Sequence, residues 1–218
     1  MSAGPGVRRG LTLASPRHEH SRVSTDTGTT GTFTRMDQST AEQWTVIGRE
    51  TVRNQPRVAE RVLGLLRSLD EITDGFSTDQ LTHCLQTATL AERAGADDEV
   101  VVAALCHDVG KAISVNNHPA IAAEILRPYV RKEVFEMIRV HQDFQGRHYY
   151  AHFGADPDAR ERHREALTAE EFALAERFAD EWDQIAFDPA YDTLPLEHFE
   201  PKVRAVFGGG APAGASAG

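Results

Sequence analysis

Cysteines and long apolar runs are scarce in this chain, and both absences exclude classes of protein. Cys84 and Cys106 are the two cysteines among 218 residues, too few for a disulfide framework, and they suit a reducing compartment. The longest unbroken apolar run, Val100–Cys106, has seven residues, whereas a membrane-spanning helix needs about 20. We therefore expect a cytoplasmic protein with neither a secretory signal nor a membrane helix.

Positive charge is also scarce. The formal net charge is −10, and five arginines against two acidic residues before residue 37 leave the rest of the chain more acidic still. A protein that holds a nucleic acid duplex needs a basic face, so we expect no nucleic acid partner. An anionic small molecule is not excluded, because metal ions and one or two cations can hold it in a pocket. The composition carries no information on oligomeric state.

The length is typical of one domain with extended ends. Residues 1–38 are rich in Gly, Ser, Thr and Arg and have no apolar period, which predicts a disordered extension. Two alternatives for this stretch are a transit peptide and a start assigned too early, with Met36 as the true start. Residues 39–207 form the predicted helical domain, and the Gly/Ala-rich residues 208–218 form a predicted disordered tail.

Strand-like alternation of apolar and polar residues is absent, whereas helical spacing recurs throughout residues 39–207. Capping-box patterns at Ser39–Glu42, Ser77–Gln80 and Thr168–Glu171 mark helix starts. Residues 144–156 are aromatic and irregular, and Pro201 predicts a break in the last helix. We expect a single all-α domain of about eight helices. Their predicted ranges are about 40–53, 56–72, 78–94, 98–110, 118–126, 130–141, 169–183 and 196–207.

The pair His107-Asp108 ends the apolar run and precedes Gly110. An imidazole gives one nitrogen to one ion, whereas the two oxygens of a carboxylate can bridge two ions about 3.5–4 Å apart. Adjacent helical residues point about 100° apart, so the pair can serve both halves of a dinuclear centre. The dipeptide is common by chance, so the prediction depends on further ligands.

Four further candidates each lie at or beside the buried face of a different predicted helix. A lone histidine there is more often a satisfied core residue, and an aspartate at a helix end is more often a cap. Burying four imidazoles and two carboxylates without partners is costly, however, and metal ions explain the set economically. We read Cys84 and Cys106 as small core residues. The predicted ligands are His83, His107, Asp108, His118, His141 and Asp183.

With Asp108 as the bridge, His83, His107 and Asp183 would complete one ion. His118 and His141 would complete the other, and each ion would keep a position open for water, oxygen or substrate. Imidazole and carboxylate donors suit iron, manganese or zinc.

At these residues the chain resembles the HD-domain superfamily, which consists of helical metalloproteins named for a His…His-Asp…Asp pattern. His83–Ala88 is similar to an H-x-x-Q-T-A segment of the superfamily's mixed-valent diiron oxygenase branch. Ala104–Lys111 resembles A-L-L-H-D-[IVL]-G-K, and Met137–His141 resembles M-I-R-x-H. Asp183 falls where the last aspartate ligand is found. The oxygenase branch includes myo-inositol oxygenase and the HD-type oxygenases that cleave phosphonates.

This resemblance implies a diiron Fe(II)/Fe(III) enzyme, or one with Mn or other divalent ions, that uses O2 to cleave a C–C or C–P bond of a small hydroxylated substrate. Asp108 and Lys111 are then the expected catalytic residues. Arg147, His148 and Tyr149, in the loop after His141, are expected to contact the substrate, although this loop can equally pack on the bundle.

The chain departs from the family pattern in two places. The interval from His107 to His118 is too short for the inserted substrate region of myo-inositol oxygenase, and the Tyr/Glu pair of the phosphonate enzyme is not evident around Asp74–Ser77. Two other functions remain open: a metal-dependent phosphohydrolase acting on a nucleotide or phosphomonoester, and a binding protein that has lost turnover.

Overall fold

The computed structural model describes Met1, residues 32–54 and residues 57–209, and within these ranges the chain is helical without a β-strand. This confirms the all-α prediction. Most of the predicted extension and tail lies outside the described residues. The chain divides into two compact units after Glu50. The elements are η1 Met36–Gln38, α1 Ala41–Asn54, α2 Val58–Arg67, η3 Ser68–Glu71, α3 Gln80–Arg93, α4 Asp98–Cys106, η4 Val109–Ala112, η5 Val115–Asn117, α5 His118–Leu126, α6 Lys132–Gln145, η6 Gly146–His148, η7 Tyr150–Phe153, η8 Ala159–His163, α7 Ala169–Arg177, η9 Phe178–Asp183 and α8 Leu196–Gly208.

The first unit contains η1, inside the stretch that we predicted to be irregular, and the start of α1. The cap of α1 is Thr40 and not Ser39. The Thr40 hydroxyl accepts from the Gln43 N–H at 3.4 Å, and the Gln43 side chain accepts from the Thr40 N–H at 2.9 Å. Ser39 instead donates to the Met36 carbonyl at 2.5 Å. Two capping boxes overlap in this sequence, and the helix uses the later one.

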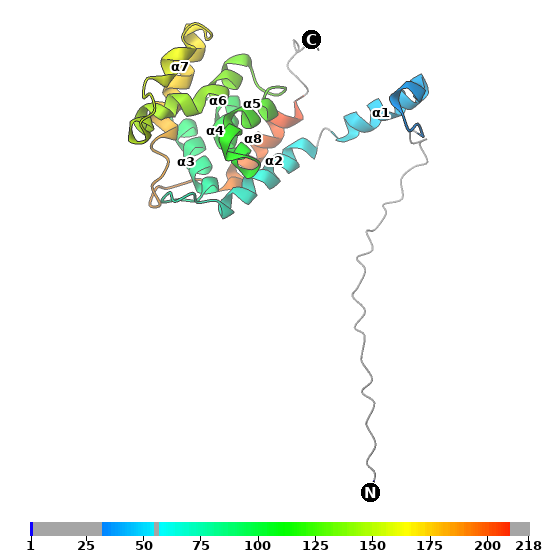
Figure 1. The fold of residues 1–218 in the computed structure, drawn as a ribbon, viewed down its shortest axis with the longest axis horizontal. Helices are drawn as coiled ribbons and strands as arrows, with labels where there is room; N and C mark the ends of the chain where they lie inside the picture. The colour runs from blue at the N-terminus through cyan, green and yellow to red at the C-terminus, as the bar shows by residue number, and fades with distance from the viewer. Residues whose placement is uncertain (2–31, 55–56, 210–218) are drawn as a thin grey trace. The chain divides into compact units, whose positions relative to one another are not determined.

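Helix α4 is the centre of the second unit. Asp97 caps its start by accepting from the backbone N–H groups of Glu99 and Val100, and every residue of Val100–Cys106 is buried. A helix that is apolar on all sides can only be accommodated inside a domain. Helix α4 packs against α3, α6 and α8, and these helices lie around it in Figure 1. The end of α4 is therefore deep in the molecule, which matters because His107 and Asp108 follow it directly.

The cap of helix α3 lies two residues later than predicted. Its cap is Asp79, whose carboxylate accepts from the Thr82 N–H at 2.8 Å, whereas Ser77 donates to the carbonyl of Phe187. Gly95 ends the helix as predicted, with a left-handed φ of +78° that glycine adopts without strain. The cap that we assigned to Ser77 was wrong because this side chain bonds the loop that precedes α8.

The end of α6 and the start of α7 enclose a second, smaller core. Phe144, which we predicted to lie in an irregular segment, belongs to the last turn of α6 and is buried with its ring centroid 4.8 Å from that of Phe172. The capping box at Thr168 is confirmed, because Thr168 and Glu171 bond each other's backbone N–H.

Helix α7 continues into η9, a π-helical segment. The N–H of Gln184 bonds the carbonyl of Ala179, five residues earlier, at 3.2 Å. Such wide turns are rare, and they frequently occur at functional sites. Asp183 is the last residue of η9 and is completely buried.

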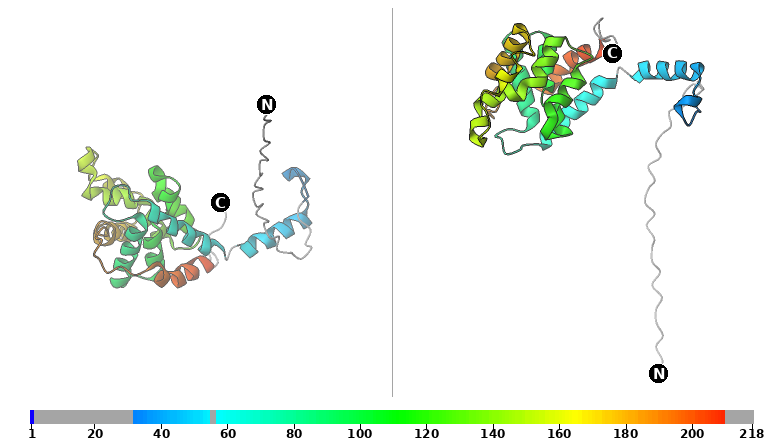
Figure 2. Two further views of the ribbon diagram at one scale, coloured as in Figure 1. Left: turned by 90° about the horizontal axis from the view of Figure 1, so that it is seen from below. Right: turned by 45° about the horizontal axis from the view of Figure 1, so that its top comes forward.

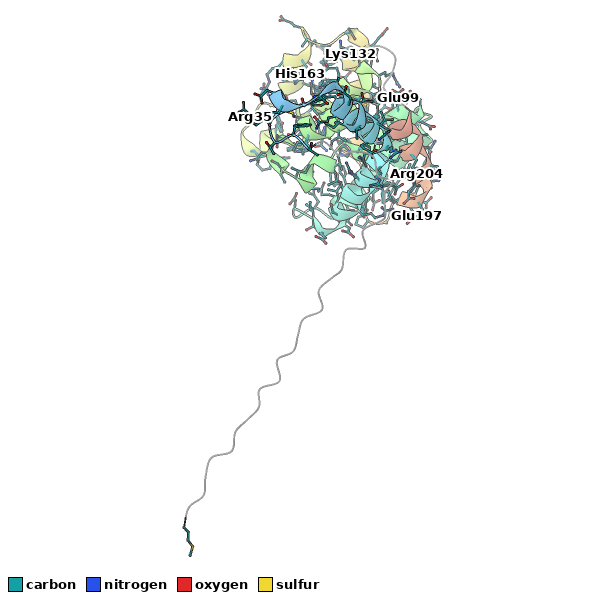
Figure 3. All side chains as sticks on the ribbon, turned by 90° about the vertical axis from the view of Figure 1, so that its right-hand side faces the viewer. Arg35, Glu99, Lys132, His163, Glu197 and Arg204 are labelled. Atoms are coloured by element: carbon teal, nitrogen blue, oxygen red, sulfur yellow. The ribbon has the colours of Figure 1, made fainter. Side chains whose placement is uncertain are left out.

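Helix α8 lies beside α2 (Figure 2). Arg204 projects from α8 (Figure 3), and its Nε donates to Glu60 on α2 at 2.8 Å. The predicted break at Pro201 is wrong, because α8 runs through it to Gly208. Proline removes one backbone donor, but Phe199 and Val203 are buried on either side of it and hold the helix on the core.

Candidate metal centre

Six buried side chains from five segments meet at the end of α4. One comes from α3, two follow α4, one begins α5, one lies in the third turn of α6 and one ends η9. The structure thus brings together all the residues that we predicted as ligands. They are His83, His107, Asp108, His118, His141 and Asp183, each with no more than 5% of its surface exposed.

All four imidazoles are oriented by a backbone carbonyl at Nδ1. A carbonyl can only accept, so Nδ1 carries a proton in each ring and Nε2 is the nitrogen left to bind a metal ion. The carbonyls come from the preceding turn for three of the histidines and from the loop after η9 for His83. The acceptors are Ala186 for His83 at 2.9 Å, Ala104 for His107 at 2.7 Å, Val115 for His118 at 2.7 Å and Ile138 for His141 at 2.7 Å.

One group of donor atoms consists of His83, His107 and Asp183. The two Nε2 atoms lie 3.0 Å apart, and Asp183 Oδ1 is 3.1 Å from His83 Nε2 and 3.4 Å from His107 Nε2. Neither Nε2 can donate to the other when both Nδ1 atoms are protonated. Their donor atoms all lie within 4.8 Å of one another, a spacing suitable for a metal ion.

The Asp108 carboxylate divides its two oxygens between two pairs of histidines. Its Oδ2 is 3.6 Å from His83 Nε2 and 3.4 Å from His107 Nε2. Its Oδ1 is 3.0 Å from His118 Nε2 and 3.6 Å from His141 Nε2, and these two Nε2 atoms are 3.2 Å apart. A carboxylate in this position can bridge two ions.

This arrangement fits cations better than hydrogen bonds. Four Nε2 atoms point at each other and at two carboxylates, and Asp108 Oδ1 and Asp183 Oδ2 are buried without a hydrogen-bond donor. Buried polar atoms without partners are costly, and a cation between the Nε2 and carboxylate atoms removes that cost. Nitrogen and oxygen donors of this kind suit iron, manganese or zinc.

The backbone around Gly110 places the two histidine pairs next to each other. Asp108 leaves helical geometry, with φ −101° and ψ 4°, and η4 follows at once. A Cβ on Gly110 would lie 2.7 Å from the Cα of His118 and closer still to its carbonyl oxygen. Only glycine permits this approach, so Gly110 lets the start of α5 lie against the end of α4.

Lys111 and Gln145 hold the two carboxylates. Lys111 Nζ lies 2.7 Å from Asp108 Oδ2 and donates to the Gln80 side chain at 2.9 Å. Gln145 Nε2 donates to Asp183 Oδ1 at 2.9 Å. Each carboxylate is therefore fixed by a neutral or cationic donor outside the histidine set, as is usual around metal ligands.

Mutual interactions shift the pKa values inside the cluster. Burial disfavours charge on His107, but the carboxylates of Asp108 and Asp183 outweigh it and raise the His107 pKa well above its ordinary value. Burial likewise opposes ionisation of both aspartates, yet His107 and the neighbouring imidazoles lower both carboxyl pKa values. Burial lowers the pKa of His141. In the absence of a metal ion, a proton on His107 thus balances part of the negative charge.

A cavity of about 640 Å³ lies against the cluster. His83, from the group with His107 and Asp183, lines it, and so does His118, from the pair with His141. Ions held by either set would therefore face the same space. The other lining residues are Asp74, Phe76, Lys111, Val115, Gln142, Gln145, His148, Tyr149, His152, Phe153, Gln184 and Phe187.

Two of the three residues predicted to contact a substrate, His148 and Tyr149, line the cavity. Arg147 is exposed and does not. Arg147 and His148 are neighbours in a 3-10 turn, so their side chains point in different directions, and a substrate contact by Arg147 stays a prediction. His148 Nε2 donates to Asp180 at 2.8 Å.

The glutamines and phenylalanines of the cavity were missed. Gln145 follows His141 by four residues, and helical spacing alone could have placed it beside His141. Phe187 could not have been found this way. Its ring stacks on His83 with centroids 4.2 Å apart, and Phe76 stacks on Phe187 at 4.9 Å. These contacts join segments that are over 100 residues apart in sequence.

The two cysteines take no part in the ligand groups found among the described residues. Both are completely buried within the main apolar core. Burial raises the pKa of each thiol, which disfavours the thiolate that binds metal.

Among the described residues, every helix is too short or too polar to span a membrane.

Comparison with known proteins agrees with this geometry. The family model of the HD domain matches residues 81–188. The chain is also 29% identical over 100 residues to [1-hydroxy-2-(trimethylamino)ethyl]phosphonate dioxygenase (glycine-betaine-forming) of Leisingera caerulea, which covers 40% of this chain and 51% of that protein. The chain thus spans about half the length of the curated relative that it matches. Residues 81–188 of this chain therefore form an HD domain, which is built around His107 and Asp108.

Proposed function

We propose that the chain is a dinuclear-metal enzyme that uses O2 to cleave a C–C or C–P bond of a small hydroxylated substrate. The observation that carries this proposal is the division of the Asp108 carboxylate, whose oxygens face two different histidine pairs. One carboxylate between two sets of imidazoles suits a pair of ions. We favour Fe(II)/Fe(III), with manganese or another divalent ion as the alternative.

In this proposal His83, His107 and Asp183 would hold one ion, His118 and His141 would hold the other, and the Asp108 carboxylate would serve both. Bound iron would supply the redox chemistry by accepting and returning electrons next to the substrate hydroxyl. The Phe187 ring covers one face of His83 and so keeps water from that side of the imidazole.

Lys111 is the proposed catalytic cation. Its Nζ lines the cavity and stays protonated, because the ion pair with Asp108 raises its pKa against the effect of burial. There it can hold an anionic oxygen of the substrate while it keeps the Asp108 carboxylate in place. His148 and Tyr149 also line the cavity and are proposed to contact the substrate.

The substrate class rests on the relative from Leisingera caerulea, whose name describes dioxygenase action on a 1-hydroxyphosphonate with a carboxylate product. When both atoms of O2 enter such a cleavage, carbon gains one oxygen and phosphorus the other. The reaction then balances without an added reductant. We propose a phosphonate or a polyol-like compound for this chain.

Iron content and redox state test the proposal. Anaerobic loading should give two irons per chain, and partial oxidation should give the paramagnetic resonance signal of a mixed-valent pair. Addition of a 1-hydroxyphosphonate should then cause O2 consumption with release of phosphate. A redox-silent protein that holds one divalent ion per chain would overturn the proposal.

A metal-dependent phosphohydrolase is the second candidate, and one observation favours it. His83, His107, Asp183 and Asp108 Oδ2 already form a complete set for a single ion that activates water. Such an enzyme would hydrolyse phosphomonoesters or nucleotides with Mn²⁺ and would retain this activity in His118→Ala. Loss of both the activity and the metal in that variant would exclude it.

A further inference from the structure

Exposed apolar side chains in residues 57–209 are concentrated in and beside the cavity lining, and we call the exposed part of this lining the mouth. Single exposed apolar residues are ordinary, but a contiguous group marks a binding surface. Three of the five in residues 57–209 line the cavity, and the other two lie within two residues of lining positions. They are Phe76, Ile113, Val115, Phe153 and Ile185, of which Phe153 is 79% exposed.

Among the charged groups on the cavity wall, Lys111 and His148 are paired, whereas no ion pair is found for the Asp74 carboxylate among the described residues. Lys111 pairs with Asp108 at 2.7 Å, and His148 pairs with Asp180 at 2.8 Å. No arginine from the described ranges lines the cavity. The polar groups that remain near the metal cluster are mainly glutamine amides. A wall of this kind offers little to a second anionic group on the substrate, which Asp74 would also repel.

The size of the cavity also indicates a substrate that extends beyond its hydroxylated head. Its volume of about 640 Å³ falls in the range that holds drug-sized ligands, about 300–1,000 Å³. A substrate made only of a hydroxylated head would leave most of this space to water, next to Phe76, Tyr149 and Phe153. Apolar rings at a wet surface gain free energy when an apolar group covers them.

We propose that the substrate has two unlike ends, and this inference rests on the function proposed above. The oxygen-bearing head lies at the His/Asp cluster. The other end is an uncharged aryl or branched alkyl group that covers Phe76 and Phe153 at the mouth.

Matched ligand pairs test the inference. Full-length protein loaded with Zn²⁺, which has no redox chemistry, is titrated calorimetrically with (1-hydroxyethyl)phosphonate and (1-hydroxy-2-phenylethyl)phosphonate. The phenyl compound should bind at least about tenfold more tightly. Phe153→Ala and Phe76→Ala should remove this gain and leave the affinity for the smaller compound within about twofold. Tyr191→Ala, outside the cavity lining, is the control and should keep the gain.

Two further probes separate the inference from the proposed function. Ethyl phosphate and 2-phenylethyl phosphate carry the same pair of tails on a hydrolase-type head. A gain from phenyl with these esters, without binding of either hydroxyphosphonate, would support the apolar mouth and count against the oxygenase. Binding of both hydroxyphosphonates with equal affinity would leave the oxygenase in place and overturn the apolar mouth.

Three other outcomes would also overturn the inference. The first is tighter binding of 1-hydroxy-2-(trimethylamino)ethylphosphonate than of the phenyl compound, because Asp74 would then be selecting a cation. The second is no measurable binding of either phenyl-bearing probe. The third is a dimer in light scattering that Phe153→Asp dissociates, because a second copy would then cover the mouth.

Discussion

At the scale of single residues, the Nδ1 contacts decide what the cluster can bind. A histidine with a free Nδ1 could offer either nitrogen, but a backbone carbonyl at Nδ1 leaves only Nε2. The four free nitrogens then converge on Asp108 and Asp183. His118 is one example: the Val115 carbonyl occupies its Nδ1 and leaves Nε2 as the nitrogen that can bind a metal ion.

His118→Ala should reduce the metal content from two ions per chain to one. It removes an Nε2 that lies 3.0 Å from Asp108 Oδ1 and leaves the group of His83, His107 and Asp183 unchanged. Elemental analysis after anaerobic loading measures the change, and O2-dependent activity should fall at least about 100-fold. His198→Ala, an exposed histidine on α8, is the control. Two ions per chain in His118→Ala would contradict the assignment.

Metal binding should become stronger as the pH rises. The His107 pKa is raised in the folded protein, so the proton stabilises the metal-free fold at low pH, and this contribution is lost as the pH rises from about 6.5 through the folded pKa. A metal ion replaces that proton. The gap in melting temperature between metal-loaded and metal-free protein should therefore widen from about pH 6 to about pH 8, with proton release on binding. A gap that is independent of pH would refute this.

At the scale of elements, the end of α4, the start of α5 and η9 build the centre. The end of α4 supplies both members of the HD pair because Asp108 leaves helical geometry directly after His107. The wide turns of η9 bury Asp183 at the end of a helix, where an aspartate would ordinarily be solvated.

Gly110→Ala tests how α5 is held against α4. The added Cβ would collide with the backbone of His118, so the start of α5 must move. We expect a loss of about 1–3 kcal/mol in the free energy of unfolding and weaker binding of the second metal ion. Denaturant unfolding and metal analysis measure the two effects.

Gly64→Ala is the matched control for Gly110→Ala. It lies inside α2 with open space around its Cβ position, and alanine there should raise stability by about 0.5–1 kcal/mol. Equal effects of the two substitutions would show that the approach of α5 is not tight.

At the scale of the whole molecule, both the cluster and the cavity lie in the second unit, which begins at Thr51. A fragment of residues 51–218 should bind the same number of metal ions as the full chain, with a melting temperature within about 3 °C. A fragment from residue 68 loses the buried Val62, Leu63 and Leu66 of α2 and should not fold. Loss of metal from the 51–218 fragment would show that the first unit supports the site.

Much of the helical pattern followed from local sequence. Thr168 caps α7, Gly95 ends α3, and the apolar run Val100–Cys106 forms the buried α4 as predicted. Caps and glycine stops act over three or four residues, so neighbouring residues suffice to reveal them. Where two caps overlapped, as at Ser39 and Thr40, local sequence did not decide between them.

The tertiary structure decided the relations between distant segments. It divided the oxygens of Asp108 between two histidine pairs, stacked Phe187 on His83, and turned Arg147 away from the cavity. None of these follows from a local period, because each depends on how helices far apart in the sequence pack together. The sequence by itself determined which side chains could bind metal, and packing determined that they meet, because a coordination site requires positions fixed to a fraction of an ångström.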